Sequence, residues 1–495
     1  MSENRNVAAN TFTQIAGRFL TLLISLVTLS YIANYLFVDG SALVGYGQYT
    51  IVLTYISIIG ATADLGLFTL VVREITGKEP EAAGRIVGSA LVFRFLLMLV
   101  TLLVLAGLYK ALPYDVVVKQ GIILGAVIAF LMLFSQAIAT IFQANYLSSR
   151  IVVSELAGRL VMAILTIYFL RLGLGLIPVI AANLIGNIVL LIVSYLMSRR
   201  TLPIKINFDW ALWKQTLPEF WSIAVVTLLG LIHFRLDSLI LSFYQPVSQV
   251  GIYGVAYRIF DIILVIPAIV VANLLPVLTH LHHSNLKAEI NRLVKRSTGL
   301  LFTVSSAIGV VILLLAPWIV IFVTSQEFLA SALPLRLLVP AFMALFLTTI
   351  YAGTAIALRQ QKRLIGGYCL VVLLDIVLNL TLIPRYSYAG AAMSTVTSEL
   401  VLMSYSFYLL TKLLPLRLRD LPLGRMALMV LMIGTLGVFA HQFIIPPISR
   451  FVMLAKMFQG VWLVGVGGLI IVGSVGLYWL LFQASTRRID DKGSR

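Results

Sequence analysis

The sequence is a nearly continuous series of long apolar runs, separated by short breaks that hold charged residues, proline or glycine. A helix needs about 20 apolar residues to cross the hydrocarbon core of a bilayer, and most of these runs reach that length. Hydrophobic residues make up 60% of the 495 residues and charged residues only 11%. Soluble domains carry about a quarter charged residues, so little of the chain is left for one. The sequence therefore predicts an all-α polytopic membrane protein.

The apolar runs predict about fourteen membrane-spanning helices. Their approximate bounds are 12–38, 48–71, 86–110, 120–143, 152–172, 176–198, 216–243, 250–275, 297–324, 334–358, 363–383, 388–411, 425–445 and 457–482. The predicted organisation begins with a six-helix bundle (1–200), an interfacial linker (201–215) and a second six-helix bundle (216–411). A second linker (412–424), two final helices (425–482) and a tail (483–495) follow. An even number of spans places both termini on one side of the membrane.

Basic residues are distributed unequally between the two sides of this topology. With the amino terminus in the cytoplasm, 25 lysines and arginines lie on the cytoplasmic side and 7 on the outer side, while 4 arginines lie within spans. Such an excess marks the cytoplasmic side of a membrane protein. The net charge of +17 is therefore expected to contact anionic membrane lipids and not nucleic acid. We expect a multi-pass protein of the cytoplasmic (inner) membrane with both termini in the cytoplasm.

The sequence offers little for metal, redox or catalytic chemistry. Cys369 is the single cysteine, which excludes a disulfide within the chain. His280, His282 and His283 lie close together, but no cysteine or carboxylate accompanies them, so we interpret them as residues of the membrane interface. No nucleotide-binding loop or nucleophile motif is present. We expect no cofactor, no metal site and no catalytic residue.

Short motifs recur in the two halves of the chain. GQY at 47–49 opens the second predicted span, and GIY at 251–253 opens the eighth, 204 positions later. The alanine pair at 181–182 in the sixth span corresponds to the pair at 391–392 in the twelfth. Six spans per repeat keep both halves in the same orientation. Parallel repeats of this kind are typical of transporters that move two bundles around a central site.

Three ordered groups of motifs are similar to one family of transporters. The first group is GYGQY at 45–49, DLGL at 64–67 and REI at 73–75. The second is RLD at 235–237, VGIY at 250–253, YR at 257–258, Pro267 and Pro276, and the third is LNL at 378–380, LIP at 382–384 and AGAA at 389–392. Over about residues 10–410 the chain resembles the polysaccharide-repeat (O-antigen-type) flippases of the multidrug/oligosaccharidyl-lipid/polysaccharide flippase superfamily. It departs from them at Ser387-Tyr388, where a glycine-containing turn is usual, and at Asn34, where arginine is common.

The resemblance implies both a fold and a function. The fold would be two six-helix bundles that face each other in a V around a polar cavity, followed by two carboxy-terminal helices. The protein would move a polyprenyl-pyrophosphate-linked oligosaccharide from the inner to the outer leaflet, with a polysaccharide polymerase and chain-length machinery as further partners, and would not be an enzyme. Arg258 matches an arginine that related flippases of lipid-linked precursors use, so the resemblance points to this residue first.

Charged residues within the spans point to a functional site independently of the resemblance. A charge at the bilayer centre costs roughly 2.5–3.5 kcal/mol, so these groups are expected to face protein or water. A pyrophosphate diester is dianionic, and the planar guanidinium of arginine binds phosphate oxygens through two hydrogen bonds. The predicted substrate-binding residues are therefore arginines: Arg258, Arg235, Arg94 and Arg159 within the spans, and Arg18 at the cytoplasmic end of the first span.

Acidic residues within the spans are candidates for coupling transport to protons or sodium: Asp375, Glu399, Asp237 and Asp64. A structural alternative exists for these charges. Arg235 could pair with Asp237 or Asp261, and Glu155 could pair with Arg159 one helical turn later. Asp375 and Glu399 could equally be buried acids that burial keeps neutral.

Other functions compete with the flippase hypothesis. A multidrug or cation antiporter of the same superfamily has a similar number of helices, but arginines in its cavity would repel a cationic cargo. A membrane-embedded glycan polymerase or ligase would gather catalytic groups in a sizeable outer loop, and every predicted outer loop is short. Charges inside so many spans disfavour a passive scaffold. The sequence therefore favours a transporter of an anionic lipid-linked glycan.

Overall fold

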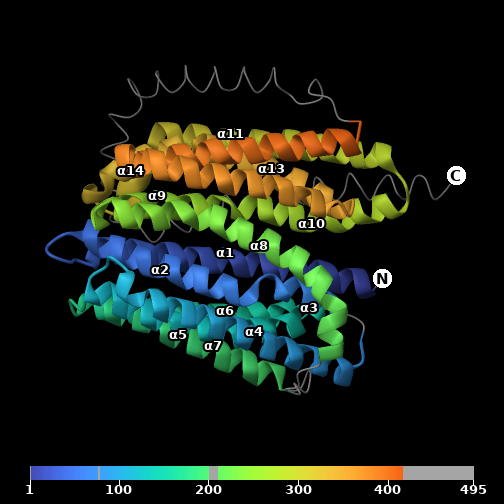
Figure 1. Ribbon diagram of the computed structural model, residues 1–495, viewed down its shortest axis with the longest axis horizontal. Helices are drawn as coiled ribbons and strands as arrows, with labels where there is room; N and C mark the ends of the chain where they lie inside the picture. The colour runs from blue at the N-terminus through green and yellow to red at the C-terminus, as the bar shows by residue number, and fades with distance from the viewer. Residues whose placement is uncertain (1, 76–77, 146, 200–209, 416–495) are drawn as a thin grey trace.

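The computed structural model describes residues 2–75, 78–145, 147–199 and 210–415. Their helices lie side by side along the long axis of the molecule (Figure 1). In chain order the elements are α1 (Ser2–Tyr35), α2 (Ala42–Asp64), α3 (Leu67–Ile75), α4 (Pro80–Leu108), η1 (Tyr109–Ala111), α5 (Val116–Ala144), α6 (Ser148–Arg171), α7 (Leu176–Ser198), α8 (Trp210–Tyr244), α9 (Val247–Ile263), α10 (Val265–His283), α11 (Lys287–Val323), η2 (Gln326–Ser331), α12 (Ala332–Leu337), α13 (Val339–Ala357) and α14 (Gln361–Leu413).

The predicted spans up to residue 411 fall largely within helical residues, although 48–71, 250–275 and 334–358 are each divided between two helices. Ten helices of the described residues are long and apolar enough to cross a membrane. That number is lower than the number of predicted spans because α14 contains two of them, and because the apolar part of α1 is only Leu20–Tyr35. The predicted spans 425–445 and 457–482, and the tail that follows them, lie outside the described residues.

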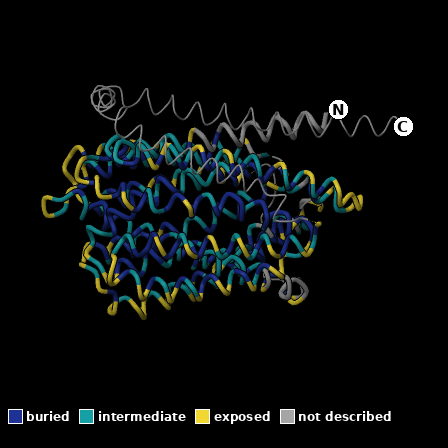
Figure 2. Tube along the Cα trace, turned by 90° about the horizontal axis from the view of Figure 1, so that it is seen from above, coloured by how far each residue is buried: buried dark blue, intermediate teal, exposed yellow. Residues whose placement is uncertain are grey.

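Large apolar side chains cover much of the outer surface. On α4, Leu103 is 65% exposed and Val100 is 59% exposed, and Leu373 on α14 is 65% exposed. Figure 2 shows the exposed positions along the outer helices and at the chain turns, with buried positions concentrated between the helices. Such a surface is unfavourable in water, whereas lipid solvates it and the helices satisfy their own backbone hydrogen bonds. The molecule is therefore an all-α multi-pass membrane protein.

The helices form two lobes, which lie one above the other in Figure 1. In the first lobe α7 packs against α5 and α6, α1 packs against α6, and α2 packs against α4 and α5. In the second lobe α14 packs against α8 and α13, and α13 packs against α10 and α11.

The long helix α8 contacts both lobes. Near its start, Trp213 stacks on Phe93 of α4 with ring centroids 4.3 Å apart, and further along α8 packs against α14. The helix begins at Trp210, so the end of the segment predicted as an interfacial linker, 210–215, forms its first turns. A movement of one lobe relative to the other must therefore involve α8.

Two backbone interruptions shape the lobes. The predicted span 48–71 is divided between α2 and α3, where Leu65 has φ 42° and Gly66 has φ 79°. In α14, Ser387 has φ 52° and ψ −133°, and the two arms fold back on each other so that Gly367 packs against Tyr405. Hence α14 is a helical hairpin whose arms are the predicted spans 363–383 and 388–411.

Candidate functional site

The two lobes touch where α2 crosses α9, close to the first turn of each helix. A Cβ atom added to Gly47 would lie 2.1 Å from the carbonyl oxygen of Val247, and one added to Gly251 would lie 2.3 Å from that of Leu43. Glycine is required for this approach, because any side chain would overlap the facing backbone. Gly47 and Gly251 are also the matching residues of the sequence repeat, as are Leu43 and Val247, so the contact is reciprocal.

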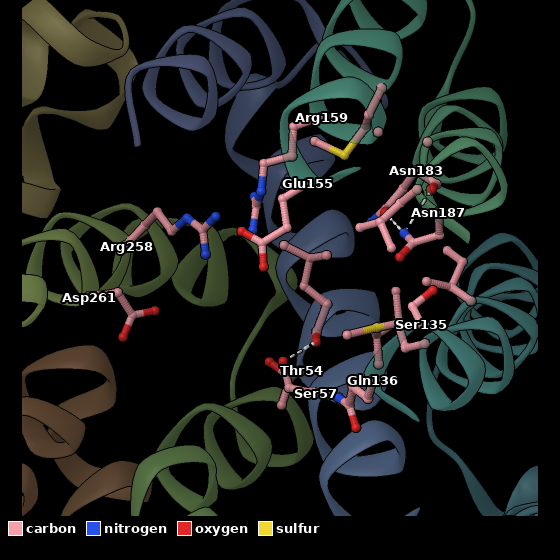
Figure 3. A pocket seen from close by; sticks show the side chains of 18 of the residues that line it. Thr54, Ser57, Ser135, Gln136, Glu155, Arg159, Asn183, Asn187, Arg258 and Asp261 are labelled. Atoms are coloured by element: carbon pink, nitrogen blue, oxygen red, sulfur yellow. Dashed lines mark hydrogen bonds between the residues drawn. The ribbon is translucent and has the colours of Figure 1, made fainter. Parts of the chain in front are cut away.

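A cavity of about 460 Å³ lies between the lobes. Helices α2, α5, α6 and α7 of the first lobe and α8 and α9 of the second lobe line it. Five charged residues are part of the lining: Glu155, Arg159, Arg235, Arg258 and Asp261. Figure 3 shows Arg258 reaching from α9 toward Arg159 and Glu155, which both extend from α6. The structure thus brings three of the predicted substrate-binding arginines into one site.

The three cavity arginines differ in the hydrogen bonds and ion pairs that their guanidinium groups make with the protein itself. Arg159 Nη1 donates a hydrogen bond of 3.1 Å to Ser25 Oγ. Arg235 Nη1 lies 3.9 Å from Asp261 Oδ2, at the limit of an ion pair. Within the described residues, the guanidinium of Arg258 has no hydrogen bond and no ion pair. Arg258 is therefore the cavity cation most available to a ligand.

Arg94 does not line the cavity. Its Nη2 lies 2.6 Å from Asp64 Oδ1, the arginine side chain is only 1% exposed, and the pair links α4 to the end of α2. Removing one partner of such a buried pair is strongly destabilising because the other charge is left uncompensated. The geometry of Arg94 and Asp64 therefore fits the structural alternative. The side chain of Arg18, on α1, lies outside what the structure describes.

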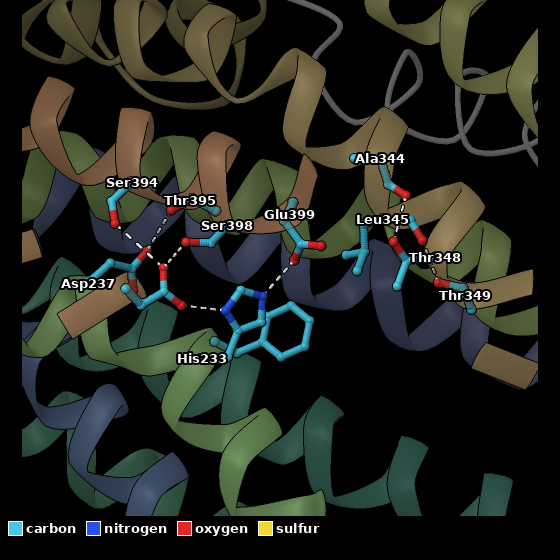
Figure 4. Close-up of polar contacts among 12 residues, drawn as sticks. His233, Asp237, Ala344, Leu345, Thr348, Thr349, Ser394, Thr395, Ser398 and Glu399 are labelled. Atoms are coloured by element: carbon cyan, nitrogen blue, oxygen red, sulfur yellow. Dashed lines mark hydrogen bonds and ion pairs between the residues drawn. The ribbon is translucent and has the colours of Figure 1, made fainter. Parts of the chain in front are cut away.

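The acidic candidates of the second lobe lie in its core, away from the cavity lining. His233 Nδ1 lies 2.5 Å from Asp375 Oδ2, and His233 Nε2 lies 3.0 Å from Glu399 Oε1 (Figure 4). His233 is on α8, whereas Asp375 and Glu399 are on the two arms of the α14 hairpin. All three residues are buried, with exposed fractions of 6%, 2% and 1%. One imidazole therefore ties both arms of the hairpin to α8.

Asp237, one turn after His233 on α8, extends this group. It accepts hydrogen bonds from the backbone N–H of Ser238 at 2.6 Å, from the hydroxyl of Tyr253 and from Thr395 Oγ1 at 3.3 Å. Ser394 and Ser398 donate to Asp375. We call His233, Asp237, Asp375 and Glu399, with these hydroxyl groups, the buried polar cluster. It joins α8, α9 and α14.

His233 was missing from the sequence-based prediction. A lone histidine in an apolar run carries no chemical signature of its own. The available signal was its spacing from Asp237, because residues four apart lie on one face of a helix. Both carboxylates that it contacts are far away in the sequence, at separations of 142 and 166 residues.

Comparisons with known proteins agree with this architecture. Among solved structures, the lipid II flippase MurJ in an inward closed conformation superposes with a TM-score of 0.65 and 14% identity over 94% of this chain and 99% of that chain. A multidrug resistance MATE family transporter of the MOP superfamily, in an inward-facing conformation, gives a TM-score of 0.66 and 14% identity over 81% and 98%. A MOP superfamily transporter from Pyrococcus furiosus gives 0.57 and 13% over 81% and 94%. At such low identity, these similarities show the fold alone.

A comparison of the sequence with curated proteins finds no match. The family model described as "Polysaccharide biosynthesis protein" matches residues 7–282, which is more than half of the chain and includes the first lobe except the start of α1, together with α8 and α9. The chain belongs to this polysaccharide biosynthesis protein family.

Proposed function

We propose that the protein is a flippase that moves a polyprenyl-pyrophosphate-linked oligosaccharide from the cytoplasmic to the outer leaflet of the cytoplasmic membrane. The observation that carries this proposal is the cavity between the lobes, in which the guanidinium of Arg258, which has no ion pair with any described residue, points toward Arg159. Two guanidinium groups suit a dianionic pyrophosphate, whose oxygens accept several charge-assisted hydrogen bonds. Between the protein walls of the cavity these interactions are screened less than in bulk water.

The substrate-binding set in this proposal is Arg258, Arg159 and Arg235. Arg235 is included because its 3.9 Å separation from Asp261 is long for an ion pair, so a phosphate oxygen can replace the carboxylate. Arg94 and Asp64 are assigned to holding α2 and α4 together. The hydrophilic headgroup would occupy the cavity, while the lipid chain remains in the bilayer.

The predicted orientation gives the structure a place in an alternating-access cycle. The crossing of α2 and α9 follows the first and fourth predicted turns on the outer side, and the first residues of both helices lie there. The structure would then represent the state in which the outer side is closed. Release of the cargo would require the contact of Gly47 with Val247, and of Gly251 with Leu43, to separate.

The buried polar cluster is the proposed site of ion coupling, through Asp375, Glu399 and Asp237 with His233. An imidazole that meets a carboxylate at each ring nitrogen donates to both only when it is protonated. His233 occupies the position between the two carboxylates that a metal cation would otherwise take. We therefore propose the proton as the coupling ion. Proton transfer would change the attraction between α8 and the α14 hairpin, and so the balance between the two states.

The test is deletion of the gene followed by analysis of the membrane lipids. We expect a pyrophosphate-linked glycan to accumulate in the inner leaflet, and plasmid-borne wild-type protein to remove it. A deletion strain without such a lipid but with raised sensitivity to cationic drugs would instead support the multidrug antiporter, which the arginines of the cavity disfavour. If a polymer of normal composition accumulated in the outer leaflet of the deletion strain, the defect would lie in a step after transport, and the flippase function would be contradicted.

A further inference from the structure

The lining of the cavity is chemically divided between helices. All five of its charged residues come from α6, α8 and α9, whereas α2, α5 and α7 contribute no charged lining residue. These three helices instead contribute neutral amides and hydroxyls. We call the following six residues the neutral shelf: Thr54, Ser57, Ser135, Gln136, Asn183 and Asn187. Figure 3 shows Gln136, Ser135 and the two asparagines on the side of the cavity away from Arg258 and Asp261.

The hydroxyl groups of the neutral shelf are partly used by their own helices. Thr54 Oγ1 donates to the carbonyl of Thr50 at 2.9 Å, and Ser57 Oγ donates to the carbonyl of Leu53 at 2.9 Å. This is the ordinary way in which hydroxyls are accommodated in apolar helices. It leaves them able to accept hydrogen bonds, but it also accounts for their presence without a ligand. The hydroxyls alone therefore do not identify a binding site.

The amides of the neutral shelf retain more hydrogen-bond donors and acceptors that are free for a ligand. Asn187 Nδ2 donates to the carbonyl oxygen and to Oδ1 of Asn183, at 2.9 and 2.8 Å. Within the described residues, Asn187 Oδ1 and Asn183 Nδ2 have no partner, so the pair presents one acceptor and one donor. Gln136 Oε1 is buried and also has no hydrogen-bond partner in the described part of the chain. A buried amide oxygen without a partner is unfavourable, and a ligand that donates to it removes that cost.

We infer that the neutral shelf is a sugar subsite and that it selects an uncharged oligosaccharide. Each sugar hydroxyl is both a donor and an acceptor, which matches the paired donor and acceptor of Asn183 and Asn187. Helices α2, α5 and α7 contribute to the cavity lining no cation that could neutralise a sugar carboxylate and no acid that could neutralise an amino group. A charged sugar would therefore lose its hydration there without compensation. The division places the pyrophosphate against the arginines and the neutral glycan against the amides.

This inference rests on the proposed function, and a binding experiment separates the two. Purified full-length protein in nanodiscs would be titrated with three farnesyl pyrophosphate diesters that carry a methyl group, glucose or glucuronic acid. We expect the glucose probe to bind at least tenfold more tightly than the methyl probe, a difference of about 1.4 kcal/mol. The glucuronic acid probe should bind no more tightly than the methyl probe.

Variants test whether the neutral shelf causes the tenfold difference in affinity between the glucose and methyl probes. The double variant Asn183→Leu/Asn187→Leu should bind the methyl and glucose probes equally, with the affinity of the wild-type protein for the methyl probe. Gln136→Met, which is close in volume, should reduce the preference for glucose while keeping the fold. Asn34→Leu is the matched control, because Asn34 Nδ2 donates to the carbonyl of Ser30 within α1 and the residue does not line the cavity. It should behave as the wild-type protein.

Each remaining outcome contradicts one proposal or both. Equal binding of the methyl and glucose probes by the wild-type protein would overturn the sugar subsite and leave the pyrophosphate site intact. Tightest binding of the glucuronic acid probe would overturn the selection of an uncharged sugar. If the wild-type protein bound none of the three probes, the proposed flippase function would fail, and the sugar subsite with it.

Discussion

The cavity and the buried polar cluster both place charged residues inside the membrane, but they arrange them in opposite ways. In the cavity the charges meet at long range or not at all, as with Arg235 and Asp261 at 3.9 Å and with Arg258. In the cluster the contacts are short and the residues are sealed, with His233 2.5 Å from Asp375. Loosely paired groups can exchange partners with a ligand, whereas tightly paired groups hold helices in place. We therefore propose that the cavity binds the cargo and that the cluster controls the conformation.

This comparison predicts two different kinds of mutant. Loss of a loosely paired charge removes little stability, because half-exposed ion pairs contribute about 0–1 kcal/mol. Loss of one partner in the cluster leaves an uncompensated buried charge, which costs about 3–5 kcal/mol. Cavity variants should therefore fold normally and fail in transport. Cluster variants should lose stability, transport or both.

The largest effect is expected for Arg258→Ala, which should abolish polymer export while the protein remains at normal abundance in the membrane. The substitution removes the cavity cation that has no partner in the described part of the protein, so the fold loses no ion pair. Surface polymer and membrane-protein level would be measured in the same cells. Arg171→Ala is the control, because Arg171 lies at the exposed end of α6 outside the cavity lining. Full export by a well-expressed Arg258→Ala protein would contradict the pyrophosphate assignment.

The next effect concerns the centre of the cluster. His233→Ala leaves Asp375 and Glu399 facing each other without the group between them, and we expect a loss of about 3–5 kcal/mol in the free energy of unfolding. Thermal unfolding of the purified protein measures this loss. The triple variant His233→Ala/Asp375→Asn/Glu399→Gln removes both carboxylate charges and should recover part of the stability. Wild-type stability of His233→Ala would show that the imidazole does not hold the hairpin to α8.

Conservative changes in the same cluster test its coupling role with a smaller effect on folding. Asp375→Asn or Glu399→Gln should slow transport several-fold and flatten its dependence on the proton gradient. The measurement is the transport rate in vesicles at several imposed gradients. Asp64→Asn is a useful comparison, since Asp64 pairs with Arg94 outside the cluster and should alter stability without altering the gradient response. An unchanged gradient response in both cluster variants would remove them from the coupling role.

The sequence predicted the helices well because the bilayer itself imposes their length and apolar composition. It also singled out the charges within the spans, and the structure brings Arg159, Arg235 and Arg258 into one cavity, while their role in transport stays a prediction. It could not separate these arginines from Arg94, whose partner Asp64 is 30 residues away on another helix. Local sequence looks the same for both kinds of arginine. Which of them meets a carboxylate is decided by the packing of helices that are distant in sequence.

The contact between α2 and α9, which we propose closes the outer end of the cavity, should give a smaller effect. Gly47→Ala should slow transport a fewfold, because the new Cβ would lie 2.1 Å from the Val247 carbonyl oxygen and force α2 and α9 apart. Gly251→Ala, its counterpart in the repeat, should have a similar effect. Gly60→Ala, on the same helix as Gly47 but with nothing within 4 Å of the added atom, should transport normally. If only one of the two crossing variants were slow, the reciprocal contact would not be what closes the cavity.

The smallest effect is expected at the turn that brings the two arms of α14, and with them Asp375 and Glu399, into register. Ser387 has φ 52°, in the left-handed region, where glycine is favoured and where the resembled flippases usually have a glycine-containing turn. Ser387→Gly should raise the free energy of unfolding by about 1 kcal/mol by relieving this conformation. The substitution also removes a hydrogen bond of 3.3 Å from Ser387 Oγ to Gln249 Oε1, so the net gain stays small.

Two further variants separate the backbone from the side chain in a thermal unfolding experiment. Ser387→Ala loses the same hydrogen bond but keeps the unfavourable φ, so it should be less stable than both the wild-type protein and Ser387→Gly. Ser404→Gly changes an exposed serine inside the second arm of α14 and should cost about 0.5–1 kcal/mol, as glycine does within a helix. A Ser387→Gly protein that is destabilised as much as Ser404→Gly would show that the turn needs the serine side chain. The register of the buried polar cluster would then depend on the contact with Gln249 and not on the turn.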